Sequence, residues 1–225
     1  MAGENLHGRL VRAIKTRVLQ WEYPPGYRLM ENEVCKEYEV SRSPAREALR
    51  TLEADGFLEK TPQRGYVVRQ PDPRKVREMY EVRLALELFV GEKLAGGAVS
   101  TEDSRFGELQ SFWKDSPNCA DRETEEFAER DRNFHEILAS MLGNTSLIRH
   151  LAMIDDRIQV FRTIEFADRQ TREMTCNQHM DILEAILKGD VTATKRAIKI
   201  NIDTALQNVE EVIKEALVRS HKFSG

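Results

Sequence analysis

Residues 24–68 read PPGYRLMENEVCKEYEVSRSPAREALRTLEADGFLEKTPQRGYVV, and this stretch decides the fold. Its opening Pro-Pro-Gly ends a helix that the four-residue recurrence of apolar side chains predicts over 6–19, because proline cannot continue the backbone hydrogen-bond ladder. Similar spacing predicts a short helix near 31–38 and a third helix over 43–55. The second and third helices are separated only by a tight connection.

The third helix is predicted to begin with Ser43 as its N-cap and Pro44 at the first helical position, because these residue types are favoured there. Two strand-like runs follow at 57–60 and 66–68, around a basic, glycine-containing tip. Three helices and a β-hairpin within about 70 residues are the plan of a winged helix-turn-helix, a fold that reads DNA.

Basic residues gather where such a fold would meet DNA. Arg42, Ser43 and Arg46 lie at the start of the third helix, and Arg64 and Gly65 lie at the hairpin tip. Arginine can hold guanine through two parallel hydrogen bonds and can neutralise phosphate, and glycine allows close approach of the backbone. Arginines also occur on ordinary solvated helix faces, but the ordered combination of elements favours DNA binding.

The segments VSRSPAREALRTLEADGFL (40–58) and RGYVV (64–68) resemble the GntR family of transcription regulators. The resemblance implies that a defined set of residues approaches DNA. These are Ser41, Arg42, Ser43, Arg46, Arg64 and Gly65. The chain departs from the family at Asn32, where many relatives carry arginine, so a base or phosphate contact at this position could differ and the operator sequence does not transfer.

The composition is that of an ordinary globular protein, with 32% charged and 40% hydrophobic residues. The net charge of −4 argues against coating nucleic acid by bulk charge; residues 1–73 hold 12 basic and 11 acidic side chains, and the rest hold 22 and 27. No membrane span or signal-peptide pattern is visible. Cys35, Cys119 and Cys176 are far apart and odd in number, so we expect no disulfide framework or cysteine zinc site, and a cytoplasmic protein.

The run Gln70-Pro71-Asp72-Pro73 predicts a break between two domains. We expect a DNA-binding domain of residues 1–70, a linker of 71–74 and a second domain of 75–222. Everything after the linker reads helical, so the fold class is mainly α, with an antiparallel helical bundle as the second domain. The predicted helices lie near 74–95, 101–113, 122–142, 145–166, 171–188 and 190–219.

The second domain is similar to the FCD effector domain of the FadR subfamily. The segments that carry the similarity are YEVRLALE (80–87), DRNFHEILASMLGN (131–144) and QHMDILEAILKGD (178–190). Six predicted helices instead of seven are typical of the VanR-like branch. The resemblance implies a helical domain that binds a ligand and forms homodimers.

Asp131 and His135 are four residues apart and therefore share a helix face, while His179 lies on another predicted helix. The resemblance implies that these three residues point into the bundle core and bind a divalent metal, namely zinc, nickel or manganese. A histidine of the last helix is the family's further ligand, but the alignment places Asn201 there, and an asparagine oxygen is a harder, weaker ligand than imidazole. Taken alone, an Asp/His pair at this spacing is more often a surface or core pair.

Arg83 and Glu87 share a face of the first helix of this domain. The resemblance places this helix beside the effector pocket and the dimer contact, where Arg83 could bind the carboxylate of an organic acid. A simple Arg83–Glu87 ion pair within the helix is at least as good an interpretation. Asn201 is the other candidate for the effector pocket.

The sequence therefore predicts a homodimeric repressor that binds a palindromic operator in double-stranded DNA under the control of a small organic acid. Two alternatives remain open: a metalloenzyme with a DNA-binding appendage, and a regulator for which metal itself is the signal. The chain contains no HExxH, Gly-rich phosphate loop or nucleophile elbow, so no recognised catalytic motif favours the enzyme.

Overall fold

The computed structural model describes residues 6–19, 22–62, 65–70, 72–114 and 119–222. Two compact units are present: Met1–Asp72 together with Val212–Gly225, and Pro73–Glu211. The chain passes from one unit to the other between Asp72 and Pro73 and again between Glu211 and Val212. None of the helices in the described ranges is both long enough and apolar enough to cross a membrane.

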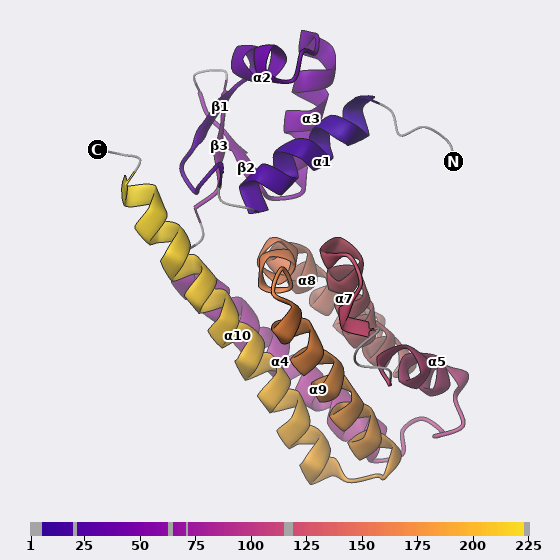
Figure 1. Cartoon of the computed structure of the whole chain (residues 1–225). Coiled ribbons are helices and arrows are strands. Elements are labelled where there is room, and N and C mark those ends of the chain that lie inside the picture. Colours follow the sequence, from indigo (N-terminus) through magenta and orange to yellow (C-terminus); the bar gives the residue numbers. More distant parts are fainter. Residues whose placement is uncertain (1–5, 20–21, 63–64, 71, 115–118, 223–225) are drawn as a thin grey trace. The chain divides into compact units, whose positions relative to one another are not determined.

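The first unit holds three helices and a small sheet, in the order α1 (Leu6–Leu19), β1 (Arg28–Met30), α2 (Glu31–Glu37), α3 (Arg42–Ala54), β2 (Leu58–Lys60) and β3 (Gly65–Val68) (Figure 1). The α1 helix buries Leu10, Ile14 and Val18, which recur every four residues. The α3 helix packs on α1 and buries Ala45 and Leu49 on the same face. The opposite face of α3 is left to solvent.

The sheet is antiparallel throughout, with strand order β1-β3-β2. The sequence predicts the β2–β3 hairpin but misses β1, which pairs Arg28 with Val67 and Leu29 with Tyr66. A strand of three residues directly after a Pro-Pro-Gly turn is too short to show the alternation of buried and exposed side chains. The fold is a winged helix-turn-helix with a three-stranded wing.

The start of α3 differs from the prediction. The N-cap is Ser41, whose backbone is extended (φ −75°, ψ 168°), and Arg42 is the first helical residue, so Ser43 is not the cap. Pro44 is then the third residue of the helix instead of the first. Proline is tolerated at this position because the first backbone N–H groups of a helix have no partner within the helix. Gly56 ends the helix with φ 83°, as the sequence predicts.

The second unit is built from helices, and every predicted helix is present with ends that shift by three residues or fewer. They are α4 (Pro73–Ala95), α5 (Ser104–Trp113), α7 (Thr124–Met141), α8 (Thr145–Glu165), α9 (Arg169–Leu187) and α10 (Val191–Lys222) (Figure 1), and α10 belongs to this unit as far as Glu211. The α4 helix packs against α7, α8 and α9, while α7 packs on α8 and α5 on α9. The centre of this bundle therefore receives side chains from several helices.

Two cysteines form a contact that the sequence does not predict. Cys119 and Cys176 are joined in a disulfide, with their Cα atoms 6.8 Å apart, while Cys35 is free. The pair is separated by 57 residues and has no motif spacing, so only the packing of α9 against the chain before α7 brings it together. The expectation that the cysteines stay unpaired is therefore wrong.

We expect protein purified without reductant to expose one titratable thiol, that of Cys35, after denaturation, and three after reduction. Reduction should also lower the melting temperature, because a disulfide closing a loop of this length restrains the unfolded chain by about 4 kcal/mol. Thiol titration with a chromogenic disulfide reagent measures the first effect, with Cys176→Ser as the control that should expose two thiols. Three reactive thiols in the unreduced wild type would show that the bond does not form.

Candidate functional site

The exposed end of α3 carries four of the residues expected at DNA. Ser41, Arg42, Ser43 and Arg46 are all exposed, while Ala45 between them is buried. The helix therefore presents its first turn outward and is held by its apolar face, as a recognition helix requires. The free N–H groups of this turn add a preference for phosphate.

Of these four described side chains, Arg46 forms an ion pair. Its Nε lies 3.6 Å from Glu31 Oε2, and the Arg46 side chain is 50% exposed. An ion pair this open to water contributes little to stability, so Arg46 can exchange Glu31 for a phosphate or a guanine. Asn32, beside Glu31 on α2, is exposed as well.

The wing contains the other two residues that were expected to approach DNA, Arg64 and Gly65. Arg64 lies outside the described residues. Gly65 is buried, and a Cβ atom there would lie 2.6 Å from Met30 Sδ. The close approach that this glycine permits within the structure is to β1, and its approach to DNA stays a prediction.

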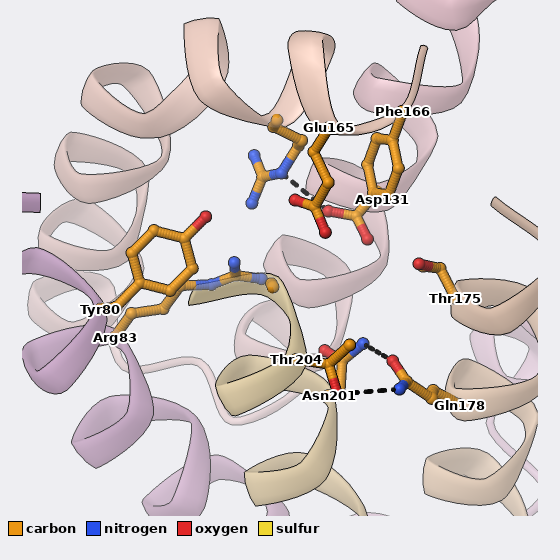
Figure 2. Close-up of a pocket in the computed structure, with 11 residues that line it drawn as sticks. Tyr80, Arg83, Asp131, Glu165, Phe166, Thr175, Gln178, Asn201 and Thr204 are labelled. Carbon is orange, nitrogen blue, oxygen red and sulfur yellow. Dashed lines mark hydrogen bonds and ion pairs between the residues drawn. The ribbon is translucent and has the colours of Figure 1, made fainter. Parts of the chain in front are cut away.

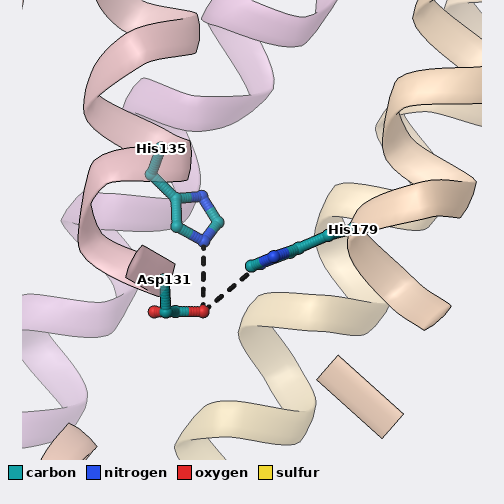
Figure 3. Close-up of side chains that lie close together, drawn as sticks. All are labelled: Asp131, His135 and His179. Carbon is teal, nitrogen blue, oxygen red and sulfur yellow. Dashed lines mark ion pairs between the residues drawn. The ribbon is translucent and has the colours of Figure 1, made fainter. Parts of the chain in front are cut away.

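A triad of buried side chains forms the centre of the second unit (Figure 3). Asp131 and His135 extend from α7, and His179 reaches them from α9. Asp131 Oδ1 lies 3.9 Å from His135 Nε2 and 3.3 Å from His179 Nε2, and one ligand atom of each residue falls within 4.8 Å of the others. The structure therefore brings together the three residues that the resemblance implied as metal ligands.

The ring nitrogens of this triad lack the partners that buried polar atoms normally have. His135 Nε2 and both nitrogens of His179 are buried without a hydrogen bond. The other nitrogen of His135, Nδ1, is 2.6 Å from Glu87 Oε2, and the other oxygen of Asp131, Oδ2, forms an ion pair with Arg162 Nε at 2.7 Å. A divalent cation would satisfy the free atoms without breaking either contact, so the residues present fit a metal.

The electrostatics keep these groups in the form that binds metal. Burial lowers the pKa of His179 to about 4, against the pull of Asp131, so its imidazole is neutral near pH 7. Burial acts to raise the pKa of Asp131, but Arg162 and the two histidines outweigh it and hold that pKa well below its usual range. A neutral imidazole and an ionised carboxylate are the ligand forms of these side chains.

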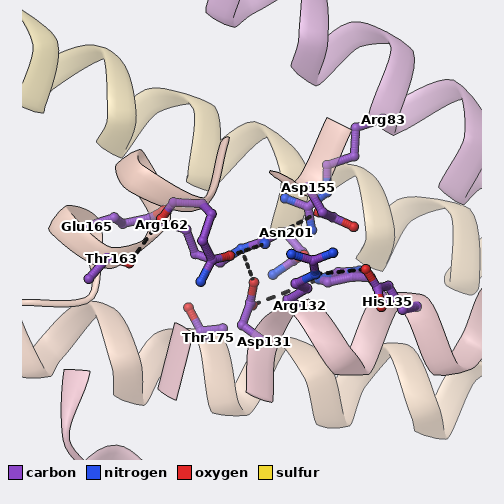
Figure 4. Close-up of polar contacts among 12 residues, drawn as sticks. Arg83, Asp131, Arg132, His135, Asp155, Arg162, Thr163, Glu165, Thr175 and Asn201 are labelled. Atoms are coloured by element: carbon purple, nitrogen blue, oxygen red, sulfur yellow. Dashed lines mark hydrogen bonds and ion pairs between the residues drawn. The ribbon is translucent and has the colours of Figure 1, made fainter. Parts of the chain in front are cut away.

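The triad belongs to a larger buried network of charges (Figure 4). Arg162 on α8 joins Asp131 to Asp155, whose Oδ1 accepts from Arg162 Nη2 at 2.8 Å. On the other side, Arg83 Nε donates to Glu87 Oε1 at 2.7 Å. Sequence patterns single out neither Arg162 nor Asp155, because a charged residue inside a helix is normally solvated and nothing local marks it as buried.

A small cavity lies beside the triad (Figure 2). Its volume of about 10 Å³ is room for a single water molecule. Asp131 belongs both to the triad and to the cavity wall, which also contains Arg83 and Asn201, the two residues expected in the effector pocket. The remaining lining residues are Tyr80, Arg162, Glu165, Phe166, Thr175, Gln178, Thr204 and Ala205.

Asn201 is held in place by its neighbours on the cavity wall. Its Nδ2 donates to Gln178 Oε1 at 2.9 Å, and Gln178 Nε2 in turn donates to Thr204 Oγ1 at 3.3 Å. A cation would bind the amide oxygen of Asn201, while the second N–H of Nδ2 could still donate to an anion. Glu165 adds an uncharged carboxyl group, since burial raises its pKa to about 8.

A winged helix-turn-helix joined to a helical domain is the architecture of a DNA-binding transcriptional regulator, and comparison with known proteins gives the family. The profile of the bacterial regulatory proteins of the gntR family matches residues 6–68, and that of the FCD domain matches residues 78–204. The chain belongs to the GntR family and carries an FCD domain. The family consists of DNA-binding transcriptional regulators and not of enzymes, so the metalloenzyme alternative is excluded.

Full-length relatives show the same arrangement. The chain is 28% identical over 211 residues to the HTH-type transcriptional repressor RspR of Escherichia coli K12, covering 92% of this chain and 90% of the relative. It is 26% identical over 204 residues to the HTH-type transcriptional regulator YdhC of Bacillus subtilis, with 90% of each chain covered. Among solved structures, the Lar regulator of Listeria monocytogenes shares the fold, with a TM-score of 0.65, 19% identity and coverage of 94% and 99%.

We expect Arg42→Ala and Arg46→Ala each to weaken binding to the specific operator about 5- to 150-fold if the arginine reads a base, which corresponds to roughly 1–3 kcal/mol. Fluorescence anisotropy with an operator found by unbiased selection measures this, and salt titrations separate phosphate from base contacts. Arg9→Ala, which removes another exposed arginine from α1, is the matched control and should change affinity less than twofold. Unchanged affinity in both α3 variants would contradict the assignment.

Proposed function

We propose that this regulator is a repressor whose affinity for a palindromic operator is set by a small organic acid bound beside a divalent metal ion. The observation that carries the proposal is that the Nε2 atoms of His135 and His179 lie beside Asp131 Oδ1, buried and without a hydrogen bond. The repressors among its relatives, RspR and a gluconate operon repressor of Bacillus licheniformis, support the sign of regulation. Metal as the signal in its own right is the second candidate, favoured by the same atoms.

Asp131, His135 and His179 would hold the metal and Asn201 would supply or flank a fourth position. Two imidazoles and one carboxylate are suited to zinc, nickel or manganese. An amide oxygen in place of a third imidazole weakens the site for zinc and nickel, the metals that prefer nitrogen ligands. The metal would act as a Lewis acid that anchors a carboxylate, and this chain's own arginines would orient the remainder of the ligand.

The effector enters a cavity that is polar on nearly every side. Arg83 and Arg162 supply fixed positive charge, and guanidinium groups match the geometry of a carboxylate. The cavity holds only one water, so an acid must open the bundle to bind. A ligand that binds an open arrangement of helices better than the closed one shifts the population towards it, with a usual coupling of about 1–3 kcal/mol, or 5- to 150-fold in operator affinity.

We expect the purified protein, stripped with a chelator, to bind one divalent metal per chain, and His135→Ala to abolish binding because it removes one of three charged or nitrogen ligands. Asn201→His should tighten zinc or nickel if Asn201 is a direct ligand. Isothermal titration with zinc, nickel and manganese measures both effects, and elemental analysis checks the stoichiometry. His150→Ala removes an exposed histidine of α8 and is the control that should leave the affinity unchanged. Failure of the wild type to bind any of the three metals would refute the metal site.

The proposed homodimer has a candidate surface on the second unit. A groove of about 620 Å³ lies between α4 and α10, and Phe89 and Ile200 at its edge are 44% and 51% exposed. Acidic and basic side chains alternate around it, with Glu92 and Asp203 facing Lys195 and Lys199. A surface that carries both signs next to exposed apolar groups suits a second copy related by a twofold axis.

We expect the wild type to be a dimer at micromolar concentration and the double variant Phe89→Asp/Ile200→Asp to be monomeric, because the two added carboxylates would face apolar surface across the interface. Light scattering coupled to size-exclusion chromatography measures the mass. Met153→Asp alters an equally exposed apolar residue on α8 and should leave the dimer intact. A wild type that stays monomeric with and without operator DNA would exclude the proposal.

A further inference from the structure

Glu87 on α4 lies between a cation and one of the candidate metal ligands. Its Oε1 accepts from Arg83 Nε at 2.7 Å, and its Oε2 is 2.6 Å from His135 Nδ1. All three side chains are buried, with residue exposures of 2% for Arg83, 5% for Glu87 and 3% for His135. Both carboxylate oxygens are therefore engaged away from solvent, each by one partner.

The contact with Glu87 decides which nitrogen of His135 is free. A carboxylate can only accept, so Nδ1 carries the proton in this contact, and the corresponding neutral tautomer has its lone pair on Nε2. The Nε2 atom of His135 makes no hydrogen bond and lies 3.9 Å from Asp131 Oδ1. Histidines that bind metals commonly donate their second ring N–H to a carboxylate, which fixes the orientation of the ring and raises its basicity.

The two imidazoles of the triad are held in different ways. His179 stacks on Phe134 with ring centroids 3.8 Å apart, and the Trp113 ring lies perpendicular to it with centroids 4.2 Å apart. Its Nε2 lies 3.3 Å from Asp131 Oδ1, but neither of its nitrogens makes a hydrogen bond, so these contacts leave its protonated nitrogen undefined. His135 is the histidine of the triad whose donor and acceptor sides are set by a hydrogen bond.

We propose that Glu87 is the positioning residue of the metal site, holding His135 with its Nε2 lone pair directed at a divalent cation, and that Arg83 compensates the buried charge of Glu87 so that this carboxylate can do so. The inference rests on the proposed metal site. Under this proposal Arg83 already has a role in the absence of an effector, because its Nε donates to Glu87. The other N–H groups of Arg83 are the ones that an effector in the cavity could use. The Arg83–Glu87 pair thus connects the cavity wall with a metal ligand.

Titration of metal-free protein with zinc alone tests the proposal. Glu87→Gln should bind zinc 10- to 100-fold more weakly than the wild type, the usual effect of losing such a carboxylate partner. Glu81→Gln, which removes an exposed carboxylate from the same helix, should bind within twofold of the wild type. Nitrogen-15 spectra of the metal-free protein give an independent readout: His135 should carry its proton on Nδ1 in the wild type, and this signature should be lost in Glu87→Gln.

Glu87→Gln leaves Arg83 buried without its partner and could fail to fold for that reason alone. The double variant Arg83→Met/Glu87→Gln removes both charges, and it should fold and show the same weakened zinc binding. The role of Glu87 would be overturned, and the metal site retained, if the double variant bound zinc as tightly as the wild type. The same conclusion would follow if a folded Glu87→Gln protein did so while His135→Ala bound no zinc. A wild type that binds no zinc, nickel or manganese overturns the metal site itself.

Discussion

The carboxylate of Asp131 is the contact on which the second unit depends. One of its oxygens faces the two imidazoles and the other forms an ion pair with Arg162, so α7, α8 and α9 meet at this single group. A buried carboxylate is costly unless it is paired and hydrogen-bonded, and removing one partner typically destabilises a protein by about 3–5 kcal/mol. The helices can therefore slide or rotate only if this set of contacts is exchanged for another, which makes their packing a choice between discrete arrangements.

That property would link the proposed site to regulation. Asp131 lies in the cavity wall as well as in the triad, so a cation at the histidines and an anion near Arg83 would both act on contacts that fix helix positions. The cavity has room for about one water molecule, so a larger ligand has to replace contacts between protein groups by contacts of its own. A ligand can shift a two-state equilibrium only through such a difference in contacts, and here the contacts to be exchanged are ionic and buried.

The sequence predicts the helices well, but it predicts poorly which distant residues contact one another. Apolar residues at helical spacing, with Gly and Pro at the breaks, are local signals, and they place every helix of the second unit within three residues of its ends. The strand β1, the Ser41 cap and the Cys119–Cys176 bond depend on residues distant in the chain or on the exact path of a turn. Asp131, His135 and His179 come from the family resemblance, whereas Arg162 and Glu165 are revealed only by the packing that buries them.

Arg83 and Glu87 show why one pattern can support two interpretations at once. Four-residue spacing predicts an ion pair within the helix, and the structure contains it. On a solvated helix such a pair would contribute a few tenths of a kcal/mol and have no further consequence. Here burial removes competing water, so the second oxygen of Glu87 must find a donor and finds His135, while Arg83 stays in the cavity wall. The sequence therefore indicates only an ion pair between these two residues, whereas the structure shows that the pair also connects the cavity with the triad. Burial of the pair is what distinguishes this arrangement from an ordinary surface ion pair.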